Sequence, residues 1–327
     1  MKTKSILLFA LPLLTLCACN KEVQEVNDNQ SVSIIASYDN ADTKAILTEP
    51  SVGVYSMSWS GNEIMLVYPV YSSYPDVYTG MLPSAKYIFT NQSGAGVSSR
   101  FTSDSFKEGG FQTGERYIVV VPKGGVSGTS AYTYRKGDQP ATDIQKYGCS
   151  VILPANQTYC ASNPLCLDED IIPLVGFIEV GNASFEPTNV MLKTPATVVK
   201  LVLTNKTGST QNIGSITLEA SNVNDSFNLA NQVWFSINNF TTFAPIFDGQ
   251  TYFQTGKSIT LDCGGVAMAN NETKTFSFVI NGNRDWGTLT WKVFDTAATP
   301  VQIGSNITTT PAKKLFSGLV YTKTANL

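Results

Sequence analysis

Apolar and polar residues alternate along most of the chain after residue 30. This alternation, with a period of two, is typical of half-buried β-strands and predicts strands at Glu63–Tyr68 and Glu115–Val121. Four later segments each place three apolar side chains on one face: Val199, Leu201 and Leu203; Ile216, Leu218 and Ala220; Phe276, Phe278 and Ile280; and Leu289, Trp291 and Val293. A further strand is expected within Leu315–Thr324. No helical periodicity of useful length follows the first residues, so the pattern predicts an all-β chain of β-sandwich type.

Two domains are expected from the length of 327 residues. Gly181-Asn182 and Glu186-Pro187 interrupt two strand-rich halves, which favours an N-terminal sandwich over residues 31–185 and a C-terminal one over 186–327. Phe-Gln-Thr-Gly occurs at residues 111–114 and again at 253–256, each time before a predicted strand. Such a short repeat is explained equally well by duplication and by coincidence.

The first 18 residues form a predicted signal peptide. Lys2 and Lys4 precede an apolar run, Ile6–Leu16, that is too short to span a bilayer. The run ends in Leu-Cys-Ala-Cys, which resembles the lipobox cut by lipoprotein signal peptidase, so Cys19 is the predicted lipidation site. Acyl chains on a cysteine hold a soluble domain at a membrane. Ordinary secretion without lipidation is the alternative.

Residues 19–30 are predicted to be a flexible tether, because they are polar and almost free of large apolar groups. Asn20 stands where an Asp would resemble an inner-membrane retention signal. Glu22, Glu25 and Asp28 resemble the acidic tethers of surface-exported lipoproteins. The predicted location is therefore the outer membrane, lipid-anchored and facing outward.

Composition and charge exclude several classes of function. The chain has a net charge of −3 and no histidine, which excludes Ser–His–Asp and Cys–His nucleophiles and His-ligated metals. A mildly acidic chain without a basic run has no footprint for nucleic acid. The acidic run Asp168-Glu169-Asp170 is more readily explained as a solvated loop, or less readily as a calcium-ligand group, than as a catalytic pair. We therefore expect a non-catalytic protein with no cofactor and no metal.

The cysteines and a tyrosine-rich segment supply the remaining candidate sites. Cys160 and Cys166 could close a short loop as a disulfide in an oxidising compartment, whereas Cys149 and Cys263 are expected to be buried. No Cys-x-x-Cys pair exists, which argues against zinc. Between Tyr68 and Tyr78, two prolines favour a loop or an edge strand carrying three candidate ligand-contact residues: Tyr71, Tyr74 and Tyr78. The alternative is that these rings fold back over the sandwich.

Several motifs together resemble a known family. The lipobox and acidic tether are followed by five segments: Val32–Tyr38, the Thr43-Lys44 step, Trp59–Val67, Gly114–Pro122 and Tyr252–Leu261. Thr273–Ile280 and a final Phe316–Tyr321 complete the pattern. In this combination and order the chain resembles the fimbrillin (type V pilin) family of surface lipoproteins, over nearly its whole length.

The resemblance implies two tandem transthyretin-like (Greek-key) β-sandwich domains after a lipoprotein signal peptide. It also implies adhesion, either as a fimbrial subunit or as a fimbria-associated anchor, accessory or tip protein. Its partners would be other fimbrial subunits bound by strand addition, the outer membrane, and a host protein or glycan. A standalone glycan-binding surface lipoprotein of a carbohydrate-uptake system is the alternative.

In that family, proteolysis in the loop after the first strand releases the strand. The cut in that family usually follows an Arg. Here no Arg precedes Arg100, and the only basic residue in that loop is Lys44. The chain also stops soon after its last predicted strand, where stalk subunits tend to carry an extra donor strand. Both departures favour an anchor, accessory or tip role, with Lys44 as the candidate maturation site.

Overall fold

The computed structural model describes about three fifths of the chain. The described residues are 32–38, 48–51, 54–56, 59–60, 63–70, 87–93, 95–96, 98–103, 106, 110–121, 130–134, 146–162, 172–181, 188–223, 229–238, 242–245, 258–282, 285–312, 314–315 and 317–327. All of them belong to one compact unit, Ser31–Leu327.

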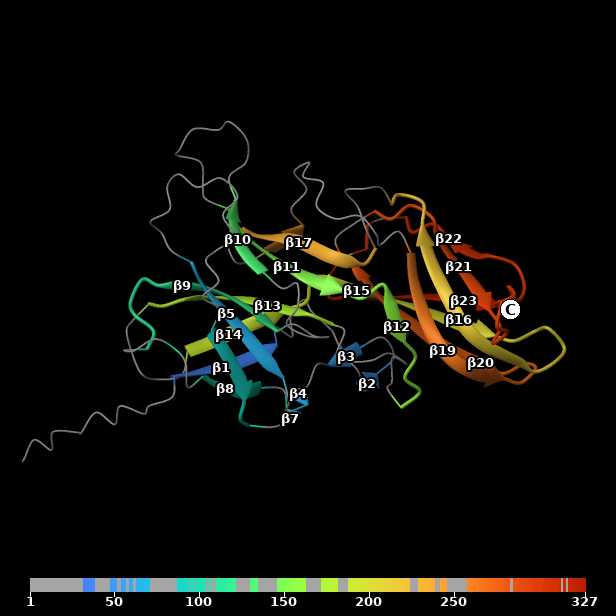
Figure 1. The fold of residues 1–327 in the computed structure, drawn as a ribbon, viewed down its shortest axis with the longest axis horizontal. Helices are drawn as coiled ribbons and strands as arrows, with labels where there is room; N and C mark the ends of the chain where they lie inside the picture. Colours follow the sequence, from blue (N-terminus) through green and yellow to red (C-terminus); the bar gives the residue numbers. More distant parts are fainter. Residues whose placement is uncertain are drawn as a thin grey trace, which may run out of the picture. The chain divides into compact units, whose positions relative to one another are not determined.

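Within these residues the regular structure is entirely β, which confirms the predicted class (Figure 1). The strands before residue 180 are β1 (Val32–Tyr38), β2 (Thr48–Ser51), β3 (Val54–Ser56), β4 (Trp59–Ser60), β5 (Ile64–Val70), β6 (Tyr87–Asn91), β7 (Ala95–Gly96), β8 (Ser98–Ser103), β9 (Arg116–Val121), β10 (Ser130–Tyr134), β11 (Lys146–Leu153), β12 (Asn156–Thr158) and β13 (Leu174–Glu179). The later strands are β14 (Thr188–Lys193), β15 (Ala196–Thr204), β16 (Gln211–Ala220), β17 (Asn231–Asn238), β18 (Thr242–Pro245), β19 (Ser258–Met268), β20 (Thr273–Asn281), β21 (Leu289–Phe294), β22 (Ile307–Thr309) and β23 (Val320–Asn326).

Seven strands close into a barrel in the order β1-β14-β13-β9-β5-β6-β8. β1 pairs in parallel with β14 and antiparallel with β8, so β1 joins the two ends of this strand order and closes the barrel. Side chains alternate between its two faces, as a strand requires. Inside, Met65 lies opposite Phe89, and both side chains are fully buried. Gly176 lies where a β-carbon would come within 2.6 Å of Leu192, so close packing requires the glycine.

β5 runs two residues beyond the predicted strand end and includes Pro69. The sequence prediction placed this proline in a loop or at an edge, because proline donates no ladder hydrogen bond. In the structure the pairing of β5 with β6 ends at Val67, while pairing with β9 continues through Pro69 to Val70. Pro69 therefore lies where no described residue pairs with the strand on its β6 side, a position at which a ladder tolerates proline.

Two further sheets contain the strands from β15 onward, apart from β17 and β18, together with β12; we call these two sheets the second half. One is five-stranded, in the order β12-β19-β16-β21-β22, and the other is three-stranded, in the order β20-β15-β23. The apolar faces predicted from the sequence are buried: Leu201, Leu203, Ile216, Leu218, Phe276, Phe278, Ile280, Trp291 and Val293 are all 0% exposed. Ala220 is only half-buried, because it lies at the end of β16. The alternation thus identified the inward face of each of these strands correctly.

The barrel and the second half share a pairing scheme. The pairs β1–β8, β1–β14, β5–β6, β5–β9 and β9–β13 recur, in the same order and directions, as β15–β20, β15–β23, β16–β19, β16–β21 and β21–β22. Two further pairs, β6–β8 and β13–β14, close the barrel and have no counterpart among the described strands of the second half.

This correspondence argues against duplication as the origin of the repeated Phe-Gln-Thr-Gly. One copy precedes β9 and the other precedes β19, whereas the counterpart of β9 is β21. The repeat is better explained as coincidence.

Strand pairing does not divide the chain at a single position. β14 still belongs to the barrel, and the next strand, β15, belongs to the three-stranded sheet. In addition, β11 pairs with β17, and β12 pairs in parallel with β19, so strands from before residue 160 join sheets with much later ones. The domain division near residue 185 stays a prediction.

Candidate functional site

Most site residues predicted from the sequence lie outside the described residues. This holds for the lipidation site Cys19, the candidate maturation site Lys44, the candidate ligand-contact residues Tyr71, Tyr74 and Tyr78, and one half of the candidate disulfide, Cys166. These assignments stay predictions.

The side chains of two cysteines are described, whereas for Cys149 only its place in β11 is, so its burial stays a prediction. The Cys160 side chain is half-buried, and its sulfur lies 3.1 Å from the Ser162 hydroxyl oxygen. Since Cys166 is not described, the disulfide stays a prediction. Cys263 is buried, as expected. Burial, reinforced by the negative charge of Asp262, raises the pKa of the Cys263 thiol to about 12. A thiol with so high a pKa is chemically inert at neutral pH.

The candidate functional site that the structure describes most fully is the seat of β1. We define the β1 seat as β1 together with its two neighbours, β14 and β8. The sequence predicted that Val32, Ile34 and Ala36 share one face, and the structure buries Ile34 and Ala36 completely while Val32 is half-buried. β1 is thus an integral strand of the barrel with a hydrogen-bonded neighbour on each side.

Buried apolar residues lie opposite β1 on both of its neighbours. Ile34 lies opposite Phe101 of β8, and Ala36 lies opposite Val190 of β14. Trp59 packs edge-on against Phe101, with ring centroids 4.8 Å apart. Removal of β1 would therefore uncover apolar surface and two rows of backbone donors and acceptors. Such a groove is a template for another extended segment.

A polar cluster fixes the strands beside the β1 seat. Asn91 donates from Nδ2 to Oε2 of the buried Glu63 at 3.0 Å, and it accepts from the Ser99 hydroxyl at 2.5 Å. The cluster links the start of β5 to β6 and β8. Sequence reasoning missed it, because single polar residues in alternating strands give no signal of mutual contact.

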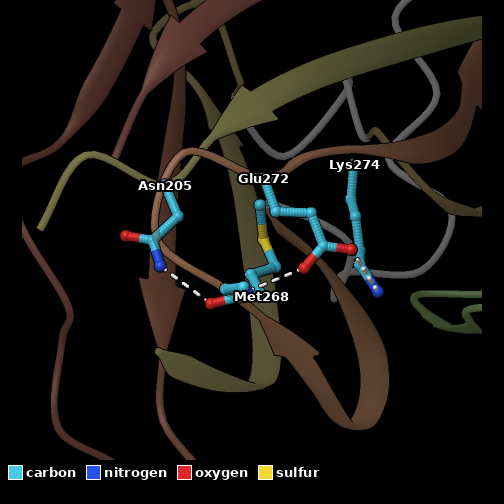
Figure 2. A network of polar contacts seen from close by, with 5 residues as sticks. Asn205, Met268, Glu272 and Lys274 are labelled. Atoms are coloured by element: carbon cyan, nitrogen blue, oxygen red, sulfur yellow. Dashed lines mark hydrogen bonds and ion pairs between the residues drawn. The ribbon is translucent and has the colours of Figure 1, made fainter. Parts of the chain in front are cut away.

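A second polar cluster organises the loops at one end of the second half (Figure 2). Asn205 is fully buried, and its Nδ2 donates to the carbonyl oxygens of Met268 and Ser209, each at 2.8 Å. Its Oδ1 accepts from both the backbone N–H and the hydroxyl of Thr207. Every hydrogen-bonding group of this amide is therefore used to hold two loops together.

Glu272 completes the second cluster (Figure 2). Its Oε2 accepts from the backbone N–H of Ala269 at 2.7 Å, and its Oε1 lies 3.3 Å from Nζ of Lys274. The Ala269 hydrogen bond, followed by the contact with Lys274, lowers the pKa of the Glu272 carboxyl. The carboxylate caps a tight turn in which Asn271 has a φ of 67°. The arrangement stabilises a loop.

The described residues contain no group of three or more His, Cys, Asp or Glu side chains that could hold a metal ion. Among these residues there is also no helix long and apolar enough to cross a membrane.

Comparison with known proteins gives structural similarities only. No model of a known protein family matches the sequence, and no curated protein matches it. The chain is similar to the solved structure of a candidate cell adhesion protein from Bacteroides uniformis, with 12% identity and a TM-score of 0.44 over 91% of this chain and 92% of that one. A candidate cell adhesion protein from Bacteroides ovatus gives 14% identity and a TM-score of 0.46 over 90% and 91% of the two chains.

A third similarity is to the tip fimbrial protein Mfa3 from Porphyromonas gingivalis, with 10% identity and a TM-score of 0.30 over 90% of this chain and 94% of that one. With TM-scores this low, these likenesses carry no conclusion about what this chain does.

Proposed function

We propose that this chain is a non-catalytic, lipid-anchored protein of the outer cell surface that acts in adhesion. In this proposal it is a fimbrial subunit or a fimbria-associated anchor, accessory or tip protein. Its two halves are proposed to be transthyretin-like β-sandwiches that follow a signal peptide, and Cys19 carries the acyl anchor.

The proposal rests first on the sequence. A basic start, a short apolar run and a cysteine after a small residue coincide at the predicted cleavage point, and an acidic tether follows. The motifs that resemble the fimbrillin family then follow in order along the chain. The shared pairing scheme of the barrel and the second half supports two related β-domains.

The single observation that carries the proposal is the β1 seat. The first strand after the tether is paired on both sides and buries Ile34 and Ala36 completely. An integral first strand directly after a surface tether fits both roles that the family offers. If β1 is retained, it connects the barrel to the lipid anchor. If β1 is released by cleavage at Lys44, it leaves a groove that a partner's strand can fill.

The test is the intact mass of the protein extracted from the cell surface, measured for the wild type and for Lys44→Ala. A diacylated chain that begins at Cys19 in both samples supports an anchored accessory protein. A chain that begins at Ala45 in the wild type but not in Lys44→Ala supports a polymerising subunit. An unacylated chain recovered from the medium would contradict the proposal. Cys19→Ser is the matched control, because it should abolish acylation and leave the fold unchanged.

A further inference from the structure

The second half of the chain has a sheet edge without a described neighbour. β23 pairs in parallel with β15, and no described strand pairs with its other side. In the barrel the counterpart of β23 is β14, which has β13 on its second side. The counterpart of β13 is β22, which is only three residues long and pairs with β21. Among the described strands, this edge is one of two places where the second half departs from the closed barrel; the other is between β19 and β20, the counterparts of β6 and β8.

The register of β23 shows which backbone groups face this edge. The N–H of Val198 donates to the carbonyl of Leu319, and the N–H of Leu327 donates to the carbonyl of Thr204. In a parallel ladder, alternate residues bond to one neighbour, so odd-numbered residues bond to β15. The N–H and C=O groups of the even-numbered residues Val320, Thr322, Thr324 and Asn326 point to the free edge. Such a row is a template for an added strand.

A charged side chain lies on the inward face of this edge strand. Lys323 lies opposite Leu201, which is fully buried in the core, so the two side chains share the inner face of the sheet. Lys323 is half-buried, and it forms no ion pair with any described residue. An inward-pointing charge on an edge strand is a known protection against indiscriminate strand pairing.

The position of Lys323 determines which strands the edge accepts. If β23 paired antiparallel with β23 of a second copy along its full length, Val320 would lie opposite Asn326, and Lys323 would lie opposite Lys323. Facing β-carbons in such a pair are about 4.5–5.5 Å apart, and like charges directly opposite are destabilising. The same geometry favours a carboxylate at that position. In this register the edge therefore disfavours a second copy of β23 and favours a strand with an acidic side chain opposite Lys323.

We propose that the free edge of β23 is a docking site for an extended acidic strand of another protein. The strand adds to the sheet antiparallel to β23, with an Asp or Glu side chain opposite Lys323. β-Branched residues on its outer face would pack beside Thr322 and Thr324, which are exposed on the same side. This site is separate from the β1 seat, and it depends neither on release of β1 nor on a role in adhesion.

The test supplies the strand in cis on the full mature chain. A Gly-Ser-Gly-Ser linker after Leu327 carries either Thr-Val-Thr-Glu-Thr-Val-Thr or the matched strand with a central lysine. A short flexible linker gives a local strand concentration in the millimolar range, so weak docking is detected. The readout is residue-resolved amide hydrogen exchange at Thr322 and Thr324. The Lys323 and Ala325 amides, which already bond to β15, serve as internal references.

The strand with the central Glu is expected to slow exchange at Thr322 and Thr324 about tenfold more than the strand with the central Lys. In Lys323→Glu the preference should reverse. Lys323→Thr without any fused strand should increase self-association in sedimentation, since the repulsion between copies is removed. Equal protection by both strands, no protection by either, or wild-type dimers paired through β23 would each overturn the proposal. Because all arms use purified protein, failure here leaves the proposed adhesive function untouched.

Discussion

The Gln157 side chain bonds to β20 on a side where no described strand pairs with it, and removal of this side chain is predicted to destabilise the second half. Gln157 lies in β12 and is 1% exposed. Its Nε2 donates to the Val279 carbonyl at 2.7 Å, and its Oε1 accepts from the Val279 N–H at 2.9 Å. Val279 is in β20, whose barrel counterpart β8 pairs with β6. One amide thus satisfies both backbone groups that β20 presents at this point.

The expected loss in the free energy of unfolding follows from the backbone groups that Gln157→Met leaves without hydrogen-bond partners. Methionine matches the length of glutamine but offers neither donor nor acceptor, so the buried N–H and C=O of Val279 lose their partners. An unsatisfied buried group costs about 1–3 kcal/mol, and added apolar burial offsets part of this. We therefore expect a loss of about 2–4 kcal/mol in the free energy of unfolding, or roughly 3–6 °C in melting temperature for a chain of this size.

The assay is urea and thermal unfolding of the purified mature chain. Gln302→Met is the matched control, because Gln302 is exposed, and its effect should stay within about 0.5 kcal/mol. The variant Gln157→Glu is expected to make the stability depend on pH. Its buried carboxylate would face the Val279 carbonyl, which raises its folded pKa above the unfolded value, so the variant should lose stability relative to wild type as pH rises from about 5 to about 7. Equal stability of Gln157→Met and Gln302→Met would refute the conclusion that Gln157 stabilises β20 through Val279.

Three further predictions follow from packing and burial. Asn205→Leu removes four hydrogen bonds of a buried amide and should lower the free energy of unfolding by about 2–4 kcal/mol in urea titration. Gly214→Ala drives a β-carbon into the Asp295 carbonyl oxygen and should lower the melting temperature clearly, whereas the β-carbon of Gly181→Ala meets nothing within 4 Å and should leave the melting temperature unchanged. Iodoacetamide at about pH 8, followed by peptide mass spectrometry, should leave Cys263 unmodified until the protein unfolds, because its thiol has a pKa of about 12.

The sequence predicted which way side chains face better than it predicted which strands are neighbours. Alternation alone identified the buried faces of β15, β16, β20 and β21, since a period of two decides the face of a strand directly. It did not reveal that β14 completes the barrel beside β1, or that β12 pairs with the distant β19. Pairing depends on contacts between segments far apart in the chain, which no local pattern encodes.

The same limit applies to the polar groups. Nothing around Gln157 distinguishes it from an exposed glutamine, and its importance comes entirely from the position of Val279. From the sequence alone, Lys323 would be taken for a solvated charge in an alternating strand. Only its position opposite Leu201 shows that it lies on the inner face of the sheet. For the lipid anchor and the maturation site the sequence remains the source of the prediction, because Cys19 and Lys44 lie outside the described residues.

The measurement that tests the proposed function most directly is the adherence of intact cells in the presence of Fab fragments raised against residues 196–327. If the protein is an outward-facing adhesin, the Fab fragments bind without permeabilisation and lower adherence to the level of a strain that lacks the protein. Fab binding only after permeabilisation, or unchanged adherence on cells whose surface is fully labelled, would contradict the proposal.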